Sequence, residues 1–407
     1  MFCMSRPVQP LELTVLFTAF IAATYGFGVY LFASLLPDMR STLGFSYSAA
    51  GGMTALAQVG LLGCASFSAG WVRRWGAERV VVCSVLVCCL GLGTMAAVRS
   101  TWQVALVLLC MGGAAAAVWV PMVAVVQRYI AVAHQGKALG LMSSGTAYGV
   151  LLNGVLISHF MPVYGWRAVW ILLGLLTALL LVWGVLRLLK GPPPPAPEGL
   201  TASRTAPAEA AAAPHLLELC RRPLVLKLLA IMFMSGLACM PSQNMLSAYL
   251  REELGYDVAQ VGMAWSVIGM AGMAGGFAMG ALADWISARA SLALTFAMLT
   301  LSALAFLLNA GVATVYLGAA LFGVAFNAIF GLVPTLISLN FVASEATRVF
   351  ACATVLLGVG SMLGNALGGL LRDWTQSFAA IYAVAFGVCL LLLGLALSLP
   401  RVAVRGN

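Results

Sequence analysis

Long apolar segments follow one another along almost the whole chain, and each is bounded by charged or turn-forming residues. A helix needs about 20 mostly apolar residues to span the hydrocarbon core of a bilayer, and the segments are close to that length or longer. The pattern therefore predicts twelve transmembrane helices. They cover residues 12–36, 47–70, 80–98, 102–127, 138–161 and 167–189, and then 223–249, 258–281, 290–309, 312–338, 349–371 and 376–398.

The second half of the chain repeats the first. Residues 43–51 (Leu-Gly-Phe-Ser-Tyr-Ser-Ala-Ala-Gly) return at 254–262 as Leu-Gly-Tyr-Asp-Val-Ala-Gln-Val-Gly, a shift of 211 positions. Each half holds six predicted spans, so both halves enter the membrane from the same side and form parallel repeats. We therefore expect an all-α membrane protein of two six-helix bundles, residues 1–190 and 223–407, joined by a cytoplasmic Pro/Ala-rich linker at 191–222.

Composition and charge agree with this architecture. Hydrophobic residues make up 62% of the chain and charged residues 8%, against roughly 25% charged residues in soluble domains. With both termini in the cytoplasm, 16 of the 21 Lys and Arg residues fall on the inner side, as the positive-inside rule requires. The net charge of +9 thus indicates topology in a cytoplasmic membrane and not nucleic-acid binding. The five outer residues are Arg40, Arg99, Arg167, Arg251 and Arg372.

Neither a cofactor nor a metal is expected. The ten cysteines lie in predicted helices or on the cytoplasmic side, and they form no Cys-x-x-Cys pair. The first apolar run is too long for the core of a signal peptide, so it is expected to remain as the first span.

Local signals predict where some helices begin and which ones touch. Ser46 and Asp257 each precede an apolar run by one residue, and Gln260 follows Asp257 at capping-box spacing. Small residues four apart favour close approach of helices, either between the moving halves or in static packing. These series are Gly145 and Gly149; Gly272, Gly276 and Gly280; and Gly360, Gly364 and Gly368.

Two loops carry a resemblance to the major facilitator superfamily, whose loops after helices two and eight usually read Gly-x-Leu-Ala-Asp-Arg-x-Gly. Residues 280–284, Gly-Ala-Leu-Ala-Asp, match this pattern. Residues 69–76, Ala-Gly-Trp-Val-Arg-Arg-Trp-Gly, carry Arg73 where the family has its acid. Within the superfamily, prokaryotic monocarboxylate and oxalate/formate-type porters are similar to this chain at residues 25–29, 128–129, 136–140 and 165–167.

The resemblance implies that the acid of each loop lies near the inner start of a helix in the other half. A cation is unfavourable there, because helix N-termini carry partial positive charge. We therefore expect a compensated exchange at a cytoplasmic gate: Arg73 meets Glu345, and Asp284 meets the start of helix five near His134 and Lys137, when the site faces outward. Alternatively, these are solvated loop charges worth at most about 1 kcal/mol each.

The middle of the membrane is expected to hold a site without charges. An ionisable group at that depth is costly and usually functional, and none is convincingly placed. The characteristic sequence motifs of drug/proton antiporters and the membrane-embedded charged residues of animal-type monocarboxylate porters are absent. Glu12, His134 or His159 could still carry a proton. The substrate-binding candidates are therefore uncharged polar and aromatic residues, each of which could instead join helices: Tyr25, Tyr30, Gln58, Trp119, Tyr148, Asn153, Gln243, Asn244, Trp265 and Asn327.

The sequence thus predicts a monomeric secondary transporter that works by alternating access and performs no enzymatic chemistry. Family likeness favours a monocarboxylate or related organic acid as its small-molecule substrate, with a proton as a candidate coupling ion and the lipid bilayer as its surroundings. An exporter of neutral or amphipathic compounds is the alternative within the same class. A non-transporting membrane sensor or scaffold on the same fold is the alternative from another class.

The gate hypothesis predicts a charge-reversal rescue. Arg73→Glu should impair solute uptake, because it would place two carboxylates against each other at the closed gate. Adding Glu345→Arg should restore uptake in the same assay by re-forming the pair with reversed polarity. A double variant no better than Arg73→Glu alone would refute the pairing.

Overall fold

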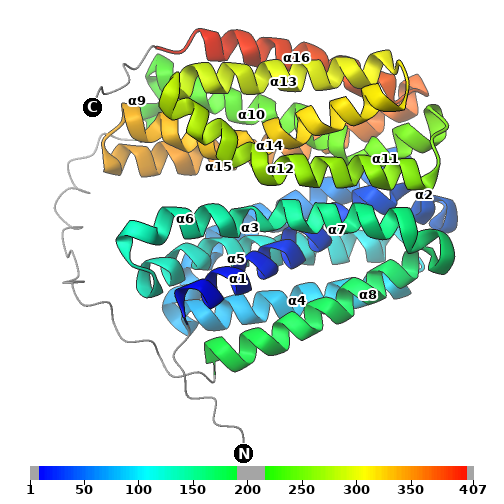
Figure 1. Cartoon of the computed structure of the whole chain (residues 1–407), viewed down its shortest axis with the longest axis horizontal. Helices are drawn as coiled ribbons and strands as arrows, with labels where there is room; N and C mark the ends of the chain where they lie inside the picture. The colour runs from blue at the N-terminus through cyan, green and yellow to red at the C-terminus, as the bar shows by residue number, and fades with distance from the viewer. Residues whose placement is uncertain (1–8, 190–215, 401–407) are drawn as a thin grey trace, which may run out of the picture.

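The computed structural model describes residues 9–189 and 216–400 and is shown in Figure 1. Twelve helical segments in this part of the chain are long and apolar enough to cross a membrane. The twelve predicted spans are thereby confirmed in number and order. Residues 191–215 of the expected linker lie outside the described residues, and its last residues form the short helix α9 (Leu216–Arg221).

The first half contains six spans, three of which are built from more than one helical element. The spans are α1 (Pro10–Ile21) with η1 (Ala22–Tyr30) and α2 (Leu31–Leu43); α3 (Tyr47–Trp75); α4 (Ala77–Ala97); α5 (Thr101–Tyr129); α6 (Val132–Ser143) with α7 (Gly145–His159); and α8 (Met161–Gly184) with η2 (Val185–Leu189).

The second half also contains six spans, and only its first is composite. The spans are α10 (Pro223–Asn244) with α11 (Leu246–Ala248) and η3 (Tyr249–Glu253); α12 (Val258–Trp285); α13 (Ala288–Leu308); α14 (Val312–Asn340); α15 (Ala343–Thr375); and α16 (Ala379–Leu397). Because the first span runs from α1 to α2, we call the two ends of the molecule the α1 end and the α2 end. They lie at the left and the right of Figure 1.

Local chemistry explains several helix boundaries. The Ser46 hydroxyl accepts a hydrogen bond from the backbone of Ala49, and Asp257 and Gln260 form the full capping box, so both predicted start signals are confirmed. Proline has no backbone N–H to continue a helical ladder, and α10 ends three residues after Pro241. The seventh span is therefore irregular near its middle, and η1, a π-helical segment, makes the first span irregular too.

The duplication seen in the sequence reappears in the contacts between helices. Among the glycines where an added Cβ would lie only 2.0–2.7 Å from a carbonyl oxygen of another helix, six are related by the repeat. These contacts form three pairs, and the second member of each pair is the first displaced by 211 residues. The pairs are Gly112 on Ala57 and Gly323 on Ile268; Gly149 on Ala22 and Gly360 on Phe233; and Gly51 on Asn365 and Gly262 on Gly154.

The two halves meet mainly through two crossings, α3 with α15 and α7 with α12, whereas α4, α8, α13 and α16 make their extensive contacts within their own half. Of the predicted glycine series, Gly360, Gly364 and Gly368 pack against α10 of the same half, and Gly149 packs against η1. These two series therefore pack within their own halves, as the static-packing alternative expects. In the third series, a Cβ on Gly272 would lie 3.4 Å from the Ala147 Cβ of α7 in the other half.

Close helix approach gives a stability prediction within α3. A Cβ at Gly60 would lie 2.0 Å from the carbonyl oxygen of Leu109, whereas a Cβ at Gly63 would have no atom within 4 Å. Gly60→Ala should therefore destabilise the protein by about 1–3 kcal/mol. Gly63→Ala should be neutral or slightly stabilising, because alanine is the better helix former. Thermal unfolding in detergent compares the two variants, and equal melting temperatures would contradict the packing argument.

Candidate functional site: a crevice between the two halves

The helices α3 and α15 touch near the α2 end and separate toward the α1 end. A Cβ on Gly369 would lie 2.2 Å from the Tyr47 carbonyl oxygen, and one on Gly358 would lie 2.6 Å from the Leu62 side chain. Further along α3, a Cβ on Gly70 would have no atom within 4 Å. The close contacts of this crossing therefore lie toward the α2 end.

The pair α7 and α12 behaves in the same way. A Cβ on Gly262 would meet the Ser158 hydroxyl at 2.3 Å, and one on Gly269 would meet the Leu151 backbone at 2.5 Å, whereas Gly280 has open space. Figure 1 shows the ribbons of the two halves close together at α2 and α11 and further apart toward the α1 end. Met270 of α12 and Phe350 of α15, at the border that faces the first half, are 48% and 43% exposed, so we interpret the space between the halves as a crevice that opens at the α1 end.

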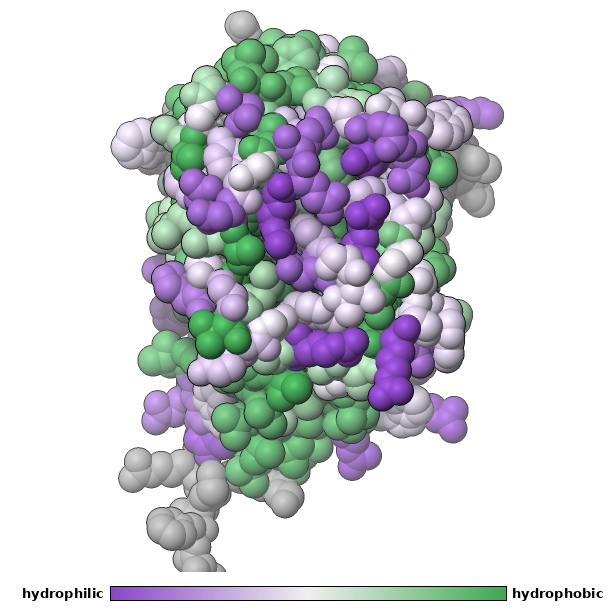
Figure 2. Space-filling view, turned by 90° about the vertical axis from the view of Figure 1, so that its right-hand side faces the viewer, coloured by the Kyte–Doolittle hydropathy of each residue, from purple (hydrophilic) through white to green (hydrophobic). Residues whose placement is uncertain are grey.

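Charged side chains hold the α2 end closed. Arg251 of η3 binds the Asp38 carboxylate of α2, and Arg40 lies 3.8 Å from Glu252. The backbone N–H of Ser48 donates to Asp373 of α15 at 2.8 Å, which adds a third polar link between the halves. In Figure 2, which views this end, hydrophilic side chains gather across the middle of the face. We call the two ion pairs, Asp38 with Arg251 and Arg40 with Glu252, the α2-end latch.

Aromatic rings close the crevice at mid-depth. Tyr30 at the end of η1 makes an edge-to-face contact with Phe326 of α14, with 6.5 Å between ring centroids. Both side chains are buried, and Phe326 also contacts Phe322 and Phe330 of its own helix. The Tyr30–Phe326 contact joins the two halves directly, so it forms the inner limit of the open crevice.

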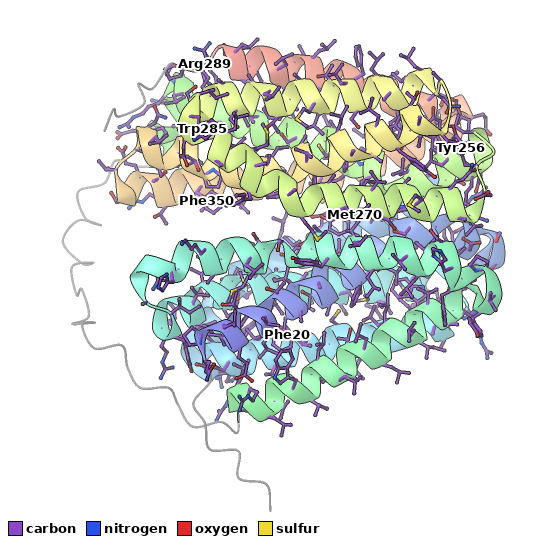
Figure 3. The ribbon with its side chains drawn as sticks, in the orientation of Figure 1. Phe20, Tyr256, Met270, Trp285, Arg289 and Phe350 are labelled. Atoms are coloured by element: carbon purple, nitrogen blue, oxygen red, sulfur yellow. The ribbon has the colours of Figure 1, made fainter. Side chains whose placement is uncertain are left out.

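On the α1 side of this contact, aromatic side chains are exposed at the depth of the spans. Tyr25 and Trp119 pack edge to face with 6.2 Å between ring centroids. Trp119, Tyr148 and Phe330 are 37%, 43% and 47% exposed, and Asn327 on α14 is partly exposed. Figure 3 shows that Met270 and Phe350 lie at the border of the second half that faces the first. The accessible wall is therefore aromatic and uncharged.

Several predicted substrate residues instead make contacts within one half. Asn153 is fully buried and donates to the Gly26 carbonyl oxygen at 2.7 Å. Trp265 is also fully buried, and its indole N–H donates to the Ser247 hydroxyl at 2.8 Å. Neither side chain reaches the crevice in this conformation, because each is engaged with an irregular segment of its own half.

The predicted amides near Pro241 are buried too. Gln243 lines a small cavity between α10, α13, α14 and α16 inside the second half, and its side-chain oxygen has no hydrogen-bond partner. Asn244 donates to the Asn365 side-chain oxygen at 2.8 Å, and Gln58 is buried in α3. Of the ten candidates, Tyr25, Trp119, Tyr148 and Asn327 are the ones accessible from outside, with Tyr30 at the inner limit.

The predicted gate residues lie at the open α1 end. Arg73, His134, Lys137 and Asp284 are exposed, and none makes an ion pair with a described residue. Glu345 pairs with Arg222 of its own half, at 3.0 Å. The expected pairs belong to a conformation in which this end is closed, so the gate stays a prediction.

Charged side chains are confined to the ends of the described spans. Glu12, one turn into α1, pairs with Arg187 at the end of the sixth span, and Glu78 at the start of α4 pairs with Arg128 at the end of α5. No cluster of metal-binding side chains occurs in the described ranges. The crevice therefore offers aromatic faces and amide groups to a ligand, without a fixed charge.

Sequence reasoning missed two parts of this site. The residues Phe322, Phe326 and Phe330 recur every four positions on α14, a stripe that could have been found from its helical spacing. The α2-end latch had no such signal, because its partners are 213 residues apart in one pair and 212 in the other and come together only through the tertiary fold.

Twelve apolar spans arranged in two repeated halves define a multi-pass membrane protein. A sequence model of the Major Facilitator Superfamily matches residues 18–341 and 244–406. The chain belongs to this superfamily. No curated protein matches it significantly in sequence.

Solved transporter structures share the fold at low sequence identity. The nucleoside transporter NupG is 13% identical with a TM-score of 0.74, and the match covers 96% of this chain and 98% of that chain. The D-xylose-proton symporter is 13% identical, with a TM-score of 0.73 and the same coverage. A bacterial homologue of the human lysosomal transporter Spinster, in an inward-facing and occupied conformation, is 14% identical with a TM-score of 0.70, covering 96% of each chain. These likenesses establish the fold.

The α2-end latch should stabilise the conformation described here. Arg251→Gln removes one ion pair between the halves, so the population open at the α2 end should rise about fivefold if the pair contributes about 1 kcal/mol. Spin labels at Ser41 and Ala259, in a variant without native cysteines, report the separation of the halves by pulsed electron resonance. Arg99→Gln removes the same charge from the same end away from the latch and is the control. An unchanged distance distribution in Arg251→Gln would contradict the assignment.

Proposed function

We propose that the protein is a secondary active transporter that carries a small organic solute across the cytoplasmic membrane by alternating access. The observation that carries the proposal is a crevice between two repeated halves that is open at the α1 end and closed by the α2-end latch. Membership of the superfamily supports it. The protein acts as a monomer and performs no covalent chemistry on its cargo.

The distribution of basic residues supports a cytoplasmic α1 end. Among the described residues, eleven Lys and Arg side chains belong to the α1 end and five to the α2 end. Short loops rich in Lys and Arg stay on the cytoplasmic side. On this orientation the structure is the inward-facing state, and the exposed gate residues lie on the cytoplasmic side.

We propose a neutral or amphipathic solute as the first candidate cargo. The accessible wall consists of Tyr25, Trp119, Tyr148 and Phe330 with the amide of Asn327. Aromatic faces and an amide bind planar or hydroxylated neutral molecules by stacking and hydrogen bonding. A carboxylate moved from water to this wall would lose hydration without gaining a cation, which is costly at low dielectric.

A monocarboxylate is the second candidate. The resemblance of four short segments to prokaryotic monocarboxylate and oxalate/formate-type porters supports it, with hydroxyl and amide donors in place of a fixed arginine. Such a carrier could take up a proton together with the anion, so that the bound species is neutral overall. The two candidates therefore predict different ligands for the same wall.

A thermal-shift screen of the purified protein should separate the candidates. A ligand present at 100 times its dissociation constant stabilises the folded state by about 2.7 kcal/mol. We expect stabilisation by a nucleoside, a pentose or an aromatic neutral amphiphile, and none by formate, lactate or oxalate. Stabilisation by an organic acid alone would overturn the neutral cargo in favour of the second candidate.

Variants of the wall test whether the hit binds in the crevice. Trp119→Ala should weaken binding about fivefold, because an aromatic contact contributes about 1 kcal/mol beyond its buried area. Trp102→Ala, which removes an exposed indole at the other end of the same helix, should leave binding unchanged. Counterflow of the labelled hit in proteoliposomes then tests transport, since a carrier shows counterflow whereas a channel or a scaffold does not.

A further inference from the structure

Two asparagines lie one position out of register with each other in the two repeated halves. Displacing residues 153–154, Asn-Gly, by 211 positions gives residues 364–365, Gly-Asn. The same two residue types are therefore present in opposite order, one on α7 and the other on α15. Both asparagines are fully buried.

Asn153 reaches the irregular segment of the first span because glycines bring the helices together. A Cβ on Gly145 would lie 2.3 Å from the Thr18 carbonyl oxygen, and one on Gly149 would lie 2.6 Å from the Gly26 Cα. One turn further along α7, the Asn153 amide N–H donates to the Gly26 carbonyl oxygen at 2.7 Å. Gly26 lies within η1, directly after Tyr25 of the crevice wall.

Asn365 reaches the irregular point of the seventh span by the same construction. Gly360, Gly364 and Gly368 of α15 pack in succession against Phe233, Leu237 and Pro241 of α10. Asn365 directly follows Gly364, and its side-chain oxygen accepts a hydrogen bond of 2.8 Å from Asn244, the last residue of α10.

Each asparagine also adjoins a crossing between the halves. Gly154, next to Asn153, lies against Gly262 of α12, and the carbonyl oxygen of Asn365 itself lies against Gly51 of α3. These two crossings are equivalent under the repeat. A movement of one half against the other therefore shifts the backbone at or next to both asparagines.

One amide atom of each asparagine remains without a partner. The side-chain oxygen of Asn153 and the side-chain nitrogen of Asn365 are buried and make no hydrogen bond. An unpaired buried polar atom is unfavourable, and these two belong to nine such side-chain atoms among the described residues.

We propose that Asn153 and Asn365 are a pair of positioning residues, one in each half, that hold the irregular segments of the first and seventh spans and transmit movement at the crossings to the crevice wall. In the conformation open at the α2 end, the two unpaired amide atoms gain partners as the crossings shift. The inference rests on the proposed alternating-access function, in which Tyr25 and Tyr30 on η1 contact the cargo or close its path.

Hydrogen exchange of the purified protein, without any solute, tests the positioning role. Asn153→Leu keeps the number and branching of the side-chain heavy atoms and removes the bond to Gly26, so amides of residues 22–30 should exchange about fivefold faster. Asn365→Leu should have the same effect at residues 242–249 and leave residues 22–30 unchanged. Asn153→Ala serves the same test if the leucine variant does not fold.

Two controls separate positioning from general destabilisation. Asn340→Leu removes a side-chain bond to a carbonyl of its own helix at the α1 end and should leave both segments protected. Gly60→Ala, which destabilises α3 against α5, should raise exchange across the first half without a maximum at residues 22–30. Unchanged protection of η1 in Asn153→Leu, or an increase no larger there than elsewhere, would overturn the proposal.

The movement is tested by the distance between labels at Ser41 and Ala259. If the unpaired amide atoms gain partners only when the α2 end opens, both leucine variants should lower the fraction open at that end in an Arg251→Gln background. An unchanged fraction would overturn this part of the proposal. Neither readout uses a transported solute, so failure here leaves the proposed transport standing, and absence of transport leaves the exchange result interpretable.

Discussion

Close approach of helix backbones is the constraint on which the rest of the structure depends. In a bilayer, helices gain little from burying apolar side chains against one another, so van der Waals contact between backbones has to hold them together. Glycine permits that contact, and here it does so at matching places in both halves: Gly149 on Ala22 and Gly360 on Phe233. The same residues that bind the helices also determine which polar side chains can reach the irregular spans.

Much of the fold is readable from the sequence because bilayer immersion is a strong constraint. Apolar length alone yields the twelve spans, and a shift of 211 residues yields the two halves. Helix starts are readable where the chemistry is local, as at Ser46 and Asp257, since a cap needs only residues three positions apart. Hydropathy cannot say which face of a helix meets which neighbour, so the sequence leaves open whether the glycine stripes join the halves or pack within one half.

The residues of the site are harder to predict from the sequence, for a related reason. Aromatic and amide residues occur both on walls and in packing, and only the tertiary fold separates Trp119, which is exposed, from Trp265, which donates to Ser247. Ion pairs at the ends of the spans are even harder to predict from the sequence. Arg251 was expected on the outer side, but its partner Asp38 lies in the other half, and no pattern within either segment links them. Contacts that depend on the relative placement of two bodies leave little trace in a local sequence pattern.

The contact between Tyr30 and Phe326 has a consequence for what a cargo has to pass. The path between the open end and the far side is interrupted at this depth by one ring from each half. A molecule resting beside Trp119 is therefore separated from the opposite compartment first by a tyrosine and a phenylalanine and then by the α2-end latch. Both barriers have to open before a solute can cross, and the width to which the two rings part limits the girth of what can pass.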